Sequence, residues 1–292
     1  MSQAAKAPDV PIPDGDAPEE RRDRRDGPGD PAAPARAAEL AAPGPVRGEV
    51  LGLAVRERRS LVFSPPPAGA PFPRGMAADG QVEPFRELRT RLLMSAGKEG
   101  MTRFTTLVVP VTAGSGASFV ARNLAAAFTL QQRLALVVDC NFRHATQHEA
   151  LGVDGGEGLA DHLARPADVP LERIVRPTAV PGLHVIPAGS DARGAAAGRR
   201  ELASSPALRA LLARLRDEPC DVFLDGPPVE GSPDARLLAD LADFVVLVVG
   251  YGRTTAAAVA QAAAAFDRRT FAGVVFNDGP DDLPGGRLPG AR

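Results

Sequence analysis

Residues 108–125 read VVPVTAGSGASFVARNLA, and this stretch decides the fold class. An apolar, β-branched run ends at Pro110, a glycine-rich turn follows, and an alanine-rich stretch of helical character begins at residue 117. A glycine-rich turn that leads from a strand into a helix presents backbone N–H groups to an anion, and the helix dipole adds to the attraction. The stretch therefore predicts a phosphate-binding loop.

The turn matches only part of the P-loop pattern GxxxxGK[ST]. Gly116 holds the second glycine and Ser118 the magnesium-binding hydroxyl. Val111 stands where the first glycine belongs, and Ala117 stands where the lysine belongs. On this loop alone two other interpretations stay open: a Rossmann GxGxxG, whose third glycine is replaced by Phe119, and a turn without a ligand.

The chain on either side of this loop alternates between predicted strands and predicted helices. The strands are expected at 104–110, 134–139, 183–188, 221–225, 244–249 and 271–276. The helices are expected at 82–97, 117–132, 158–164, 199–217, 233–242 and 254–269. The strands are continuously apolar, as in a parallel sheet that is covered on both faces. We predict a doubly wound α/β domain with a mostly parallel sheet.

Composition sets the domain boundaries and excludes several classes of protein. Residues 1–80 are predicted to be a disordered Pro/Ala/charge-rich extension, 81–279 the domain and 280–292 a flexible tail. The formal net charge of −2 gives no basic field for nucleic acid, so no nucleic-acid partner is expected. The opening residues lack the apolar core of a secretory signal, and the longest apolar run, 244–249, is too short to span a bilayer. We expect a cytoplasmic protein with no direct membrane insertion.

Polar side chains follow three further strands at the points where those strands end. Asp139 ends LVVD, Asp225 ends DVFLD and Asn277 ends VVFN. Ligands of open α/β sheets bind at the carboxyl ends of the strands, so these residues are expected near the loop. In a P-loop site such carboxylates hold magnesium and its waters, which makes Asp139, Asp225 and Ser118 the candidate metal site. The Asn277 amide is a candidate for hydrogen-bonding an adenine edge.

These motifs together resemble the bacterial protein-tyrosine kinases (BY-kinases) of capsule and exopolysaccharide synthesis, which are P-loop ATPases with deviant Walker motifs. The family loop, roughly PGEGKST, corresponds to AGSGASF at 113–119. The family's LIDADLRRPxxH corresponds to VVDCNFRHATQH at 137–148, and its IIDTPPV to FLDGPPV at 223–229. An ExxRxxR pattern precedes the loop at Glu83, Arg86 and Arg89. The resemblance covers about residues 82 to 279.

The resemblance implies ATP or ADP and Mg²⁺ as cofactors, with Asp139 and Asp225 as catalytic residues if the protein is active. The nucleotide-binding residues would be Gly114, Ser115, Gly116, Ala117, Ser118, Phe119 and Asn277. Glu83, Arg86 and Arg89 would form the interface of a homo-oligomer. The implied partner is a membrane-bound polysaccharide co-polymerase, or chain-length regulator, which would recruit the protein to the inner face of the cell membrane.

The chain departs from the family at the positions that carry the chemistry. Ala117 removes the phosphate-binding lysine, Asn141 replaces the second acid of the DxD motif, and Phe119 replaces a threonine. The nearest arginines in sequence that could replace the lysine are Arg122 and Arg143.

The C-terminal residues contain no tyrosine, whereas active family members have a tyrosine-rich tail, and the single tyrosine of the chain, Tyr251, is expected to be structural. The leading hypothesis is therefore a pseudo-kinase or a very weak ATPase. The alternatives are an active tyrosine kinase or ATPase with an unusual loop, and a partitioning-type ATPase.

Overall fold

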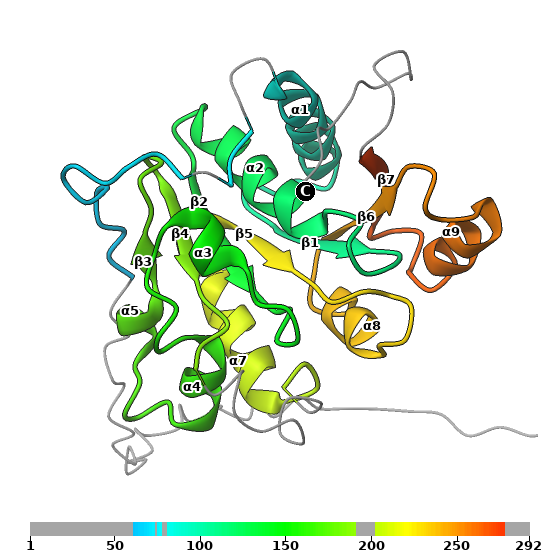
Figure 1. Cartoon of the computed structure of the whole chain (residues 1–292). Coiled ribbons are helices and arrows are strands. Elements are labelled where there is room, and N and C mark those ends of the chain that lie inside the picture. Colours follow the sequence, from blue (N-terminus) through cyan, green and yellow to red (C-terminus); the bar gives the residue numbers. More distant parts are fainter. Residues whose placement is uncertain (1–60, 74, 78–80, 191–201, 278–292) are drawn as a thin grey trace, which may run out of the picture. The chain divides into compact units, whose positions relative to one another are not determined.

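The computed structural model describes residues 61–73, 75–77, 81–190 and 202–277, arranged around a seven-stranded sheet (Figure 1). The strand order is β3-β4-β2-β5-β1-β6-β7. The strands are β1 Thr105–Pro110, β2 Leu134–Asp139, β3 Arg176–Pro177, β4 Leu183–Ile186, β5 Cys220–Asp225, β6 Phe244–Gly250 and β7 Phe271–Asn277. All neighbouring strands are parallel except β3 and β4, which are antiparallel, so the predicted mostly parallel sheet is confirmed.

The position of β1 in the sheet distinguishes between the two nucleotide-binding folds that the loop left open. β1 pairs with β5 and β6, and β5 separates it from β2. In dinucleotide-binding and flavodoxin-like sheets the first two strands are neighbours. The Rossmann interpretation is therefore wrong.

Each face of the sheet carries its own hydrophobic core, because successive side chains of a strand point to opposite faces. In β1, Leu107 and Val109 belong to one core and Val108 to the other. The first core includes side chains of α4, α5, α7, α8 and α9, and the second lies under α1 and α2, as the two helical layers of Figure 1 show. This double coverage explains why the strands are apolar at consecutive positions.

The helices agree with the prediction in place but not always in length. Their bounds are α1 Glu83–Lys98, α2 Ala117–Thr129, α3 Gln147–Leu151, α4 Leu159–Ala164, α5 Leu171–Ile174, α7 Pro206–Leu215, α8 Asp234–Ala239 and α9 Ala256–Ala263. α3, α5 and the short strand β3 were not predicted. The helix expected at 199–217 begins only at Pro206, after the N-cap Ser205, and residues 199–201 lie outside the described part. The helix expected at 254–269 ends at Ala263 and continues as turns.

Residues 61–77, where described, pack on this domain although the sequence analysis assigned them to the extension. The Leu61 amide donates to a Glu218 carboxylate oxygen at 3.0 Å, and the Ser64 carbonyl lies 2.9 Å from the His184 Nε2. Further on, the Ala77 amide donates to the Asn123 Oδ1 at 2.7 Å. The sequence pattern did not reveal these bonds because their partners are far away in the chain. Residues 1–60 and 78–80 lie outside the described part.

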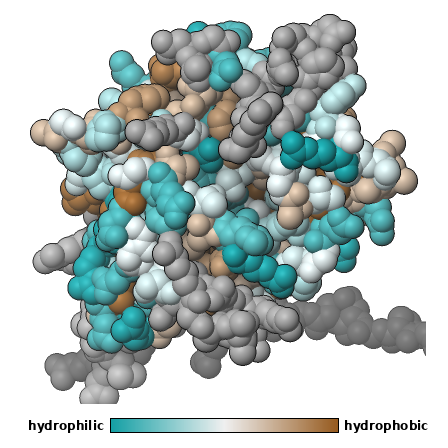
Figure 2. All heavy atoms as spheres, viewed as in Figure 1, coloured by the Kyte–Doolittle hydropathy of each residue, from teal (hydrophilic) through white to brown (hydrophobic). Residues whose placement is uncertain are grey.

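The described side chains on the face shown in Figure 2 are mixed in character, with hydrophobic residues dispersed among hydrophilic ones. None of the helices in the described ranges combines the length and the apolarity that crossing a bilayer requires. The two cysteines, Cys140 and Cys220, are free thiols in the core, as expected.

Candidate nucleotide-binding site

The loop between β1 and α2 has the backbone conformation that its glycines allow. Gly114 and Gly116 have φ angles of 79° and 85°, in the left-handed region that other residues adopt only with strain. Gly116 is the N-cap of α2, so the helix begins at Ala117 and its free N–H groups face the turn. The loop therefore has the backbone form of an anion-binding turn, and phosphate binding itself stays a prediction.

Several contacts hold the loop in this form. The Ser115 Oγ donates to the Thr112 carbonyl at 2.8 Å, and the Asn277 Nδ2 donates to the Ser115 carbonyl at 3.1 Å. A Cβ atom at Gly116 would lie 2.1 Å from the Asn277 Nδ2, so only glycine fits there. On the other side, an Arg253 Nη1 donates to the Gly114 carbonyl at 3.3 Å. The loop is thus fixed from the ends of β6 and β7.

The side-chain amide of Asn277 makes a hydrogen bond to the loop in this structure. Its Nδ2 is used by the Ser115 carbonyl, whereas its Oδ1 is buried without a hydrogen-bond partner among the described residues. The predicted contact to adenine stays a prediction.

The two candidate carboxylates meet at the carboxyl ends of β2 and β5. Asp139 and Asp225 are paired in the strand register, and both side chains are fully buried. Burial raises the pKa of Asp139 well above its usual value, and the neighbouring Asp225 raises it further. Burial also raises the pKa of Asp225, to about 6. Two buried carboxylates at one place require a proton or a cation between or beside them.

Gln147, which the sequence analysis did not single out, joins the carboxylates to the loop. Its Nε2 donates to the Asp225 Oδ2 at 2.8 Å and to the Ser118 carbonyl at 2.9 Å, while its backbone N–H donates to the Asp139 Oδ2 at 3.2 Å. The Gln147 and Ser118 side chains both lower the pKa of Asp225, against the effect of burial. Only its place inside the 137–148 motif could have drawn attention to Gln147.

A cleft of about 490 Å³ opens over the loop. Its lining includes the predicted loop residues together with polar side chains from elsewhere: Ala113, Gly114, Ser115, Gly116, Ala117, Ser118, Phe119, Arg122, Asn141, His144 and Thr146. The Oδ1 atoms of Asn141 and Asp225 are both buried without a hydrogen-bond partner among the described residues. Unsatisfied polar atoms beside an anion-binding loop are typical of a ligand site.

The three α1 residues of the ExxRxxR pattern do not share one environment. Arg86 and Glu83 form an exposed ion pair of 3.3 Å. Arg89 is buried, and its Nη1 donates to the Ala127 carbonyl of α2 at 2.7 Å. Arg89 therefore fixes α1 to α2 within the chain, and the interface role assigned to the pattern stays a prediction. Within the described ranges no cluster of three or more His, Cys, Asp or Glu could hold a metal ion.

The strand order, the glycine loop at the start of α2 and the carboxylates at the neighbouring strand ends define a domain of the P-loop NTPase class. No family model matches the chain. The chain is 32% identical over 206 residues to EpsB of Ralstonia nicotianae, named provisionally as a tyrosine-protein kinase, covering 70% of this chain and 26% of EpsB. It is 28% identical over 197 residues to the tyrosine-protein kinase YwqD of Bacillus subtilis, covering 67% of this chain and 80% of YwqD.

Among solved structures, the BceF tyrosine kinase domain superposes with a TM-score of 0.59 at 27% identity, covering 71% of this chain and 78% of that domain. The chain is homologous to the bacterial protein-tyrosine kinases over this domain, in agreement with the resemblance that the sequence motifs showed. It spans about a quarter of the length of EpsB.

Proposed function

We propose that the chain is a BY-kinase-like regulator of exopolysaccharide or capsule synthesis that binds ATP or ADP and turns ATP over slowly or not at all. One observation supports this proposal above the others. The loop and the paired carboxylates keep the form of a P-loop site, while Ala117 lines the cleft where the family places its lysine.

The residues present fit a nucleotide with magnesium. Gly114 and Gly116 give the loop an open, left-handed form into which a phosphate fits. The Ser118 hydroxyl and the buried Asp225, whose Oδ1 lacks a partner among the described residues, would hold the ion. Asp139 would hold its water ligands. Bound there, magnesium would neutralise charge on the phosphates.

The same residues support weak turnover. Phosphoryl transfer depends almost entirely on positioning and electrostatic stabilisation, so a missing cation beside the transferred phosphate is costly. A charge-assisted hydrogen bond is worth about 1.5–3 kcal/mol, which corresponds to a loss of roughly one to two orders of magnitude in affinity. Asn141 cannot act as a base at neutral pH, because an amide carries no titratable proton there.

The proposed biological role follows the family. Relatives such as EpsB and YwqD carry names as tyrosine-protein kinases. We place this chain beside a membrane-bound polysaccharide co-polymerase, which would recruit it to the inner face of the membrane. Self-association through the exposed Glu83–Arg86 edge of α1 would make it a homo-oligomer.

The test is equilibrium binding of ATP and ADP to the full chain, with and without magnesium, followed by an ATPase assay. We expect magnesium-dependent binding that is lost in Asp225→Ala, together with turnover at or near background. Absence of binding at millimolar nucleotide would refute the nucleotide part of the proposal. Turnover well above background that Asp139→Ala abolishes would instead support the second candidate, an active kinase or ATPase, which the presence of Ser118 and Asp225 beside the loop favours.

A further inference from the structure

Among the described residues, no lysine lines the cleft. The whole chain has two lysines, Lys6 and Lys98, and Lys98 lies at the far end of α1. Ala117 ends at its Cβ and is buried at the start of α2. Within the described part of the chain, a permanently charged cation at the phosphate loop is therefore an arginine.

Arg122 is the arginine that the fold places in the cleft. It belongs to the second turn of α2 and lines the cleft together with the loop residues. Only 7% of its surface is exposed, although arginine is almost never this buried without a reason. Burial lowers the pKa of Arg122, and the Asp225 charge acts against this shift.

Two groups hold the Arg122 guanidinium in position. Its Nε donates a short hydrogen bond to the Gly75 carbonyl, and its Cζ lies over the Phe119 ring, 5.2 Å from the centroid. Both contacts leave the two terminal nitrogens available to a ligand, since neither donates a hydrogen bond to any of the described residues. The contact with the ring gives a role to Phe119, the large apolar residue beside the loop.

The charge state of Arg122 suits an anionic ligand. Burial lowers the pKa of Arg122 to about 10, so the guanidinium still carries its charge at neutral pH. A buried cation is costly unless an anion compensates it. Asp225 compensates the Arg122 charge in part, and a phosphate group in the cleft would add to this compensation.

Two other arginines near the site are placed differently. Arg143 is exposed and does not line the cleft. Arg253 approaches the loop from the end of β6, where it bonds the Gly114 carbonyl, and it does not line the cleft either. The arrangement therefore favours Arg122 over both.

We infer that Arg122 supplies, from the second turn of α2, the positive charge to a bound phosphate group that the family supplies from the lysine position, now Ala117. Phe119 and Gly75 are the positioning groups of this substitute. The ligand class is an oligophosphate, of which nucleoside di- and triphosphates are the members the proposed function requires. The inference rests on that proposed function and adds the residue that lets the altered loop bind.

The experiment measures binding of ADP and of inorganic pyrophosphate to the full chain by titration calorimetry. Arg122→Met keeps the apolar stem against Phe119 and removes the charge. We expect Arg122→Met to weaken both ligands roughly tenfold to hundredfold, as loss of one charge-assisted hydrogen bond predicts. Arg122→Lys should lose much less affinity, and Arg209→Met, at an exposed arginine of α7, should lose none.

A rescue variant separates the charge from a structural role. In Arg122→Met/Ala117→Lys a lysine stands at the family position, and affinity should return to within a few-fold of the parent. If Arg122→Met unfolds, Phe119→Leu offers the second test, because it keeps the charge and removes the ring that positions it. Phe119→Leu should weaken the binding of both ligands severalfold without changing the number of ligands bound per chain.

The outcomes distinguish this inference from the proposed function. Equal affinity of the parent and of Arg122→Met would overturn the inference and leave the proposed function standing. The inference is likewise overturned if Phe119→Leu binds as the parent does, or if Ala117→Lys does not rescue the loss. No binding of either ligand by the parent would overturn both.

Discussion

Asp139 and Asp225 lie opposite each other in the register of β2 and β5, and neither side chain reaches solvent. Burial raises the pKa of both carboxyl groups, and the Asp225 charge raises that of Asp139 further. Backbone hydrogen bonds from Gln147, Asn141 and Thr146 lower the pKa of Asp139, and the Gln147, Ser118 and Arg122 side chains lower that of Asp225. The buried pair holds protons more tightly than solvent-exposed aspartates do. Its protonation is therefore the first property to test.

Asp225→Asn should flatten the pH dependence of stability. Because the pKa of Asp225 in the folded protein is about 6, above the ordinary value of 3.8, the folded state holds this proton more tightly than the unfolded state does. The free energy of unfolding of the metal-free protein should then fall as the pH rises from about 4 to about 6, by on the order of 3 kcal/mol. Urea denaturation at pH 4.5 and 7.5 measures the difference between parent and variant.

His184 makes the comparison with the variant necessary. Burial lowers the pKa of His184, which stabilises the folded protein as the pH rises and so acts in the opposite direction. The pH dependence of the parent's free energy of unfolding therefore does not by itself report on Asp225. If the free energy of unfolding of Asp225→Asn changed with pH as much as that of the parent, the raised pKa of Asp225 would be refuted.

Gly116→Ala should cost considerably more stability than Gly114→Ala. Both glycines have a positive φ, so each alanine is strained by roughly 1–2 kcal/mol. A methyl group at Gly116 would also overlap the Asn277 amide, whereas nothing lies within 4 Å of the corresponding position at Gly114. We expect a difference of at least about 1 kcal/mol between the two variants in chemical denaturation. Equal losses would mean that Asn277 does not pack under the loop.

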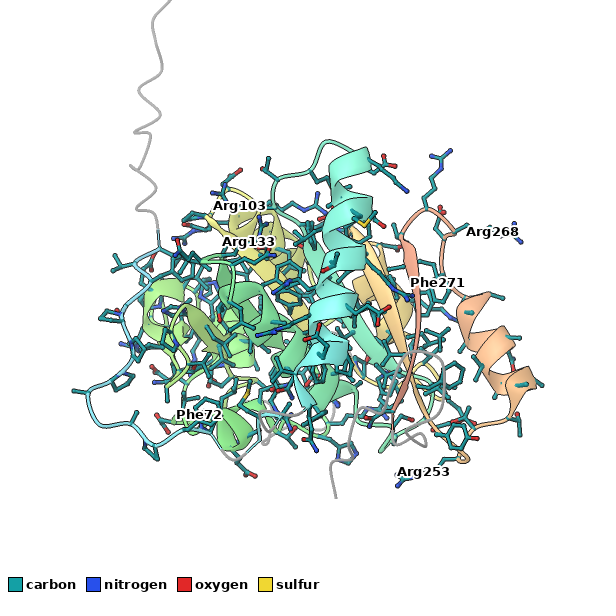
Figure 3. All side chains as sticks on the ribbon, turned by 90° about the horizontal axis from the view of Figure 1, so that it is seen from above. Phe72, Arg103, Arg133, Arg253, Arg268 and Phe271 are labelled. Carbon is teal, nitrogen blue, oxygen red and sulfur yellow. The ribbon has the colours of Figure 1, made fainter. Side chains whose placement is uncertain are left out.

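Arg133→Met should destabilise the protein by about 2–4 kcal/mol, because it leaves a buried carboxylate without its partner. Arg133 makes two bonds of 2.7 Å to Asp221, whose side chain is 2% exposed. Figure 3 shows Arg133 at the end of the sheet away from Arg253 and the phosphate loop, so nucleotide binding should not change. The measurement is guanidinium denaturation together with the binding titration.

Arg91→Met is the matched control for Arg133→Met. Arg91 pairs with Glu87 on the surface, and both side chains are more than half exposed, at 72% and 51%. Its loss should change stability by less than about 0.5 kcal/mol. Adding Asp221→Asn to Arg133→Met should recover part of the lost stability, and a failure to do so would show that lost packing, not the uncompensated charge, is the cause.

Arg86→Glu and Arg89→Met should separate assembly from folding. Arg86 is exposed, so reversing its charge should leave the unfolding free energy within about 0.5 kcal/mol while weakening self-association. Arg89 holds the Ala127 carbonyl inside the chain, so Arg89→Met should cost about 1–2 kcal/mol. Sedimentation velocity and thermal unfolding of both variants provide the readouts. Unchanged self-association in Arg86→Glu would argue against an interface at this edge of α1.

The sequence was sufficient to predict the elements and their class. Strands such as 134–139 and the loop that begins α2 were predictable because apolar runs and glycine-rich turns are local patterns, and the observed β2 has the predicted bounds. The strand ends and the family motifs predicted Asp139 and Asp225 as candidate site residues, and the structure places them together. The short elements α3, α5 and β3 were missed because so few residues carry too little periodicity to be recognised.

The tertiary structure alone decided which side chains meet. Asn277 contacts Ser115 from 162 residues away, and Asp139 reaches its place beside Asp225 only through the register of β2 on β5. Arg89 belongs to the same sequence pattern as Arg86 but turns inward, because α1 packs on α2. The sequence offered both Arg122 and Arg143 as arginines near the loop, and only the packing of Gly75 and Phe119 against Arg122 distinguishes between them. Such contacts depend on strand order, helix packing and burial, which no local stretch of sequence contains.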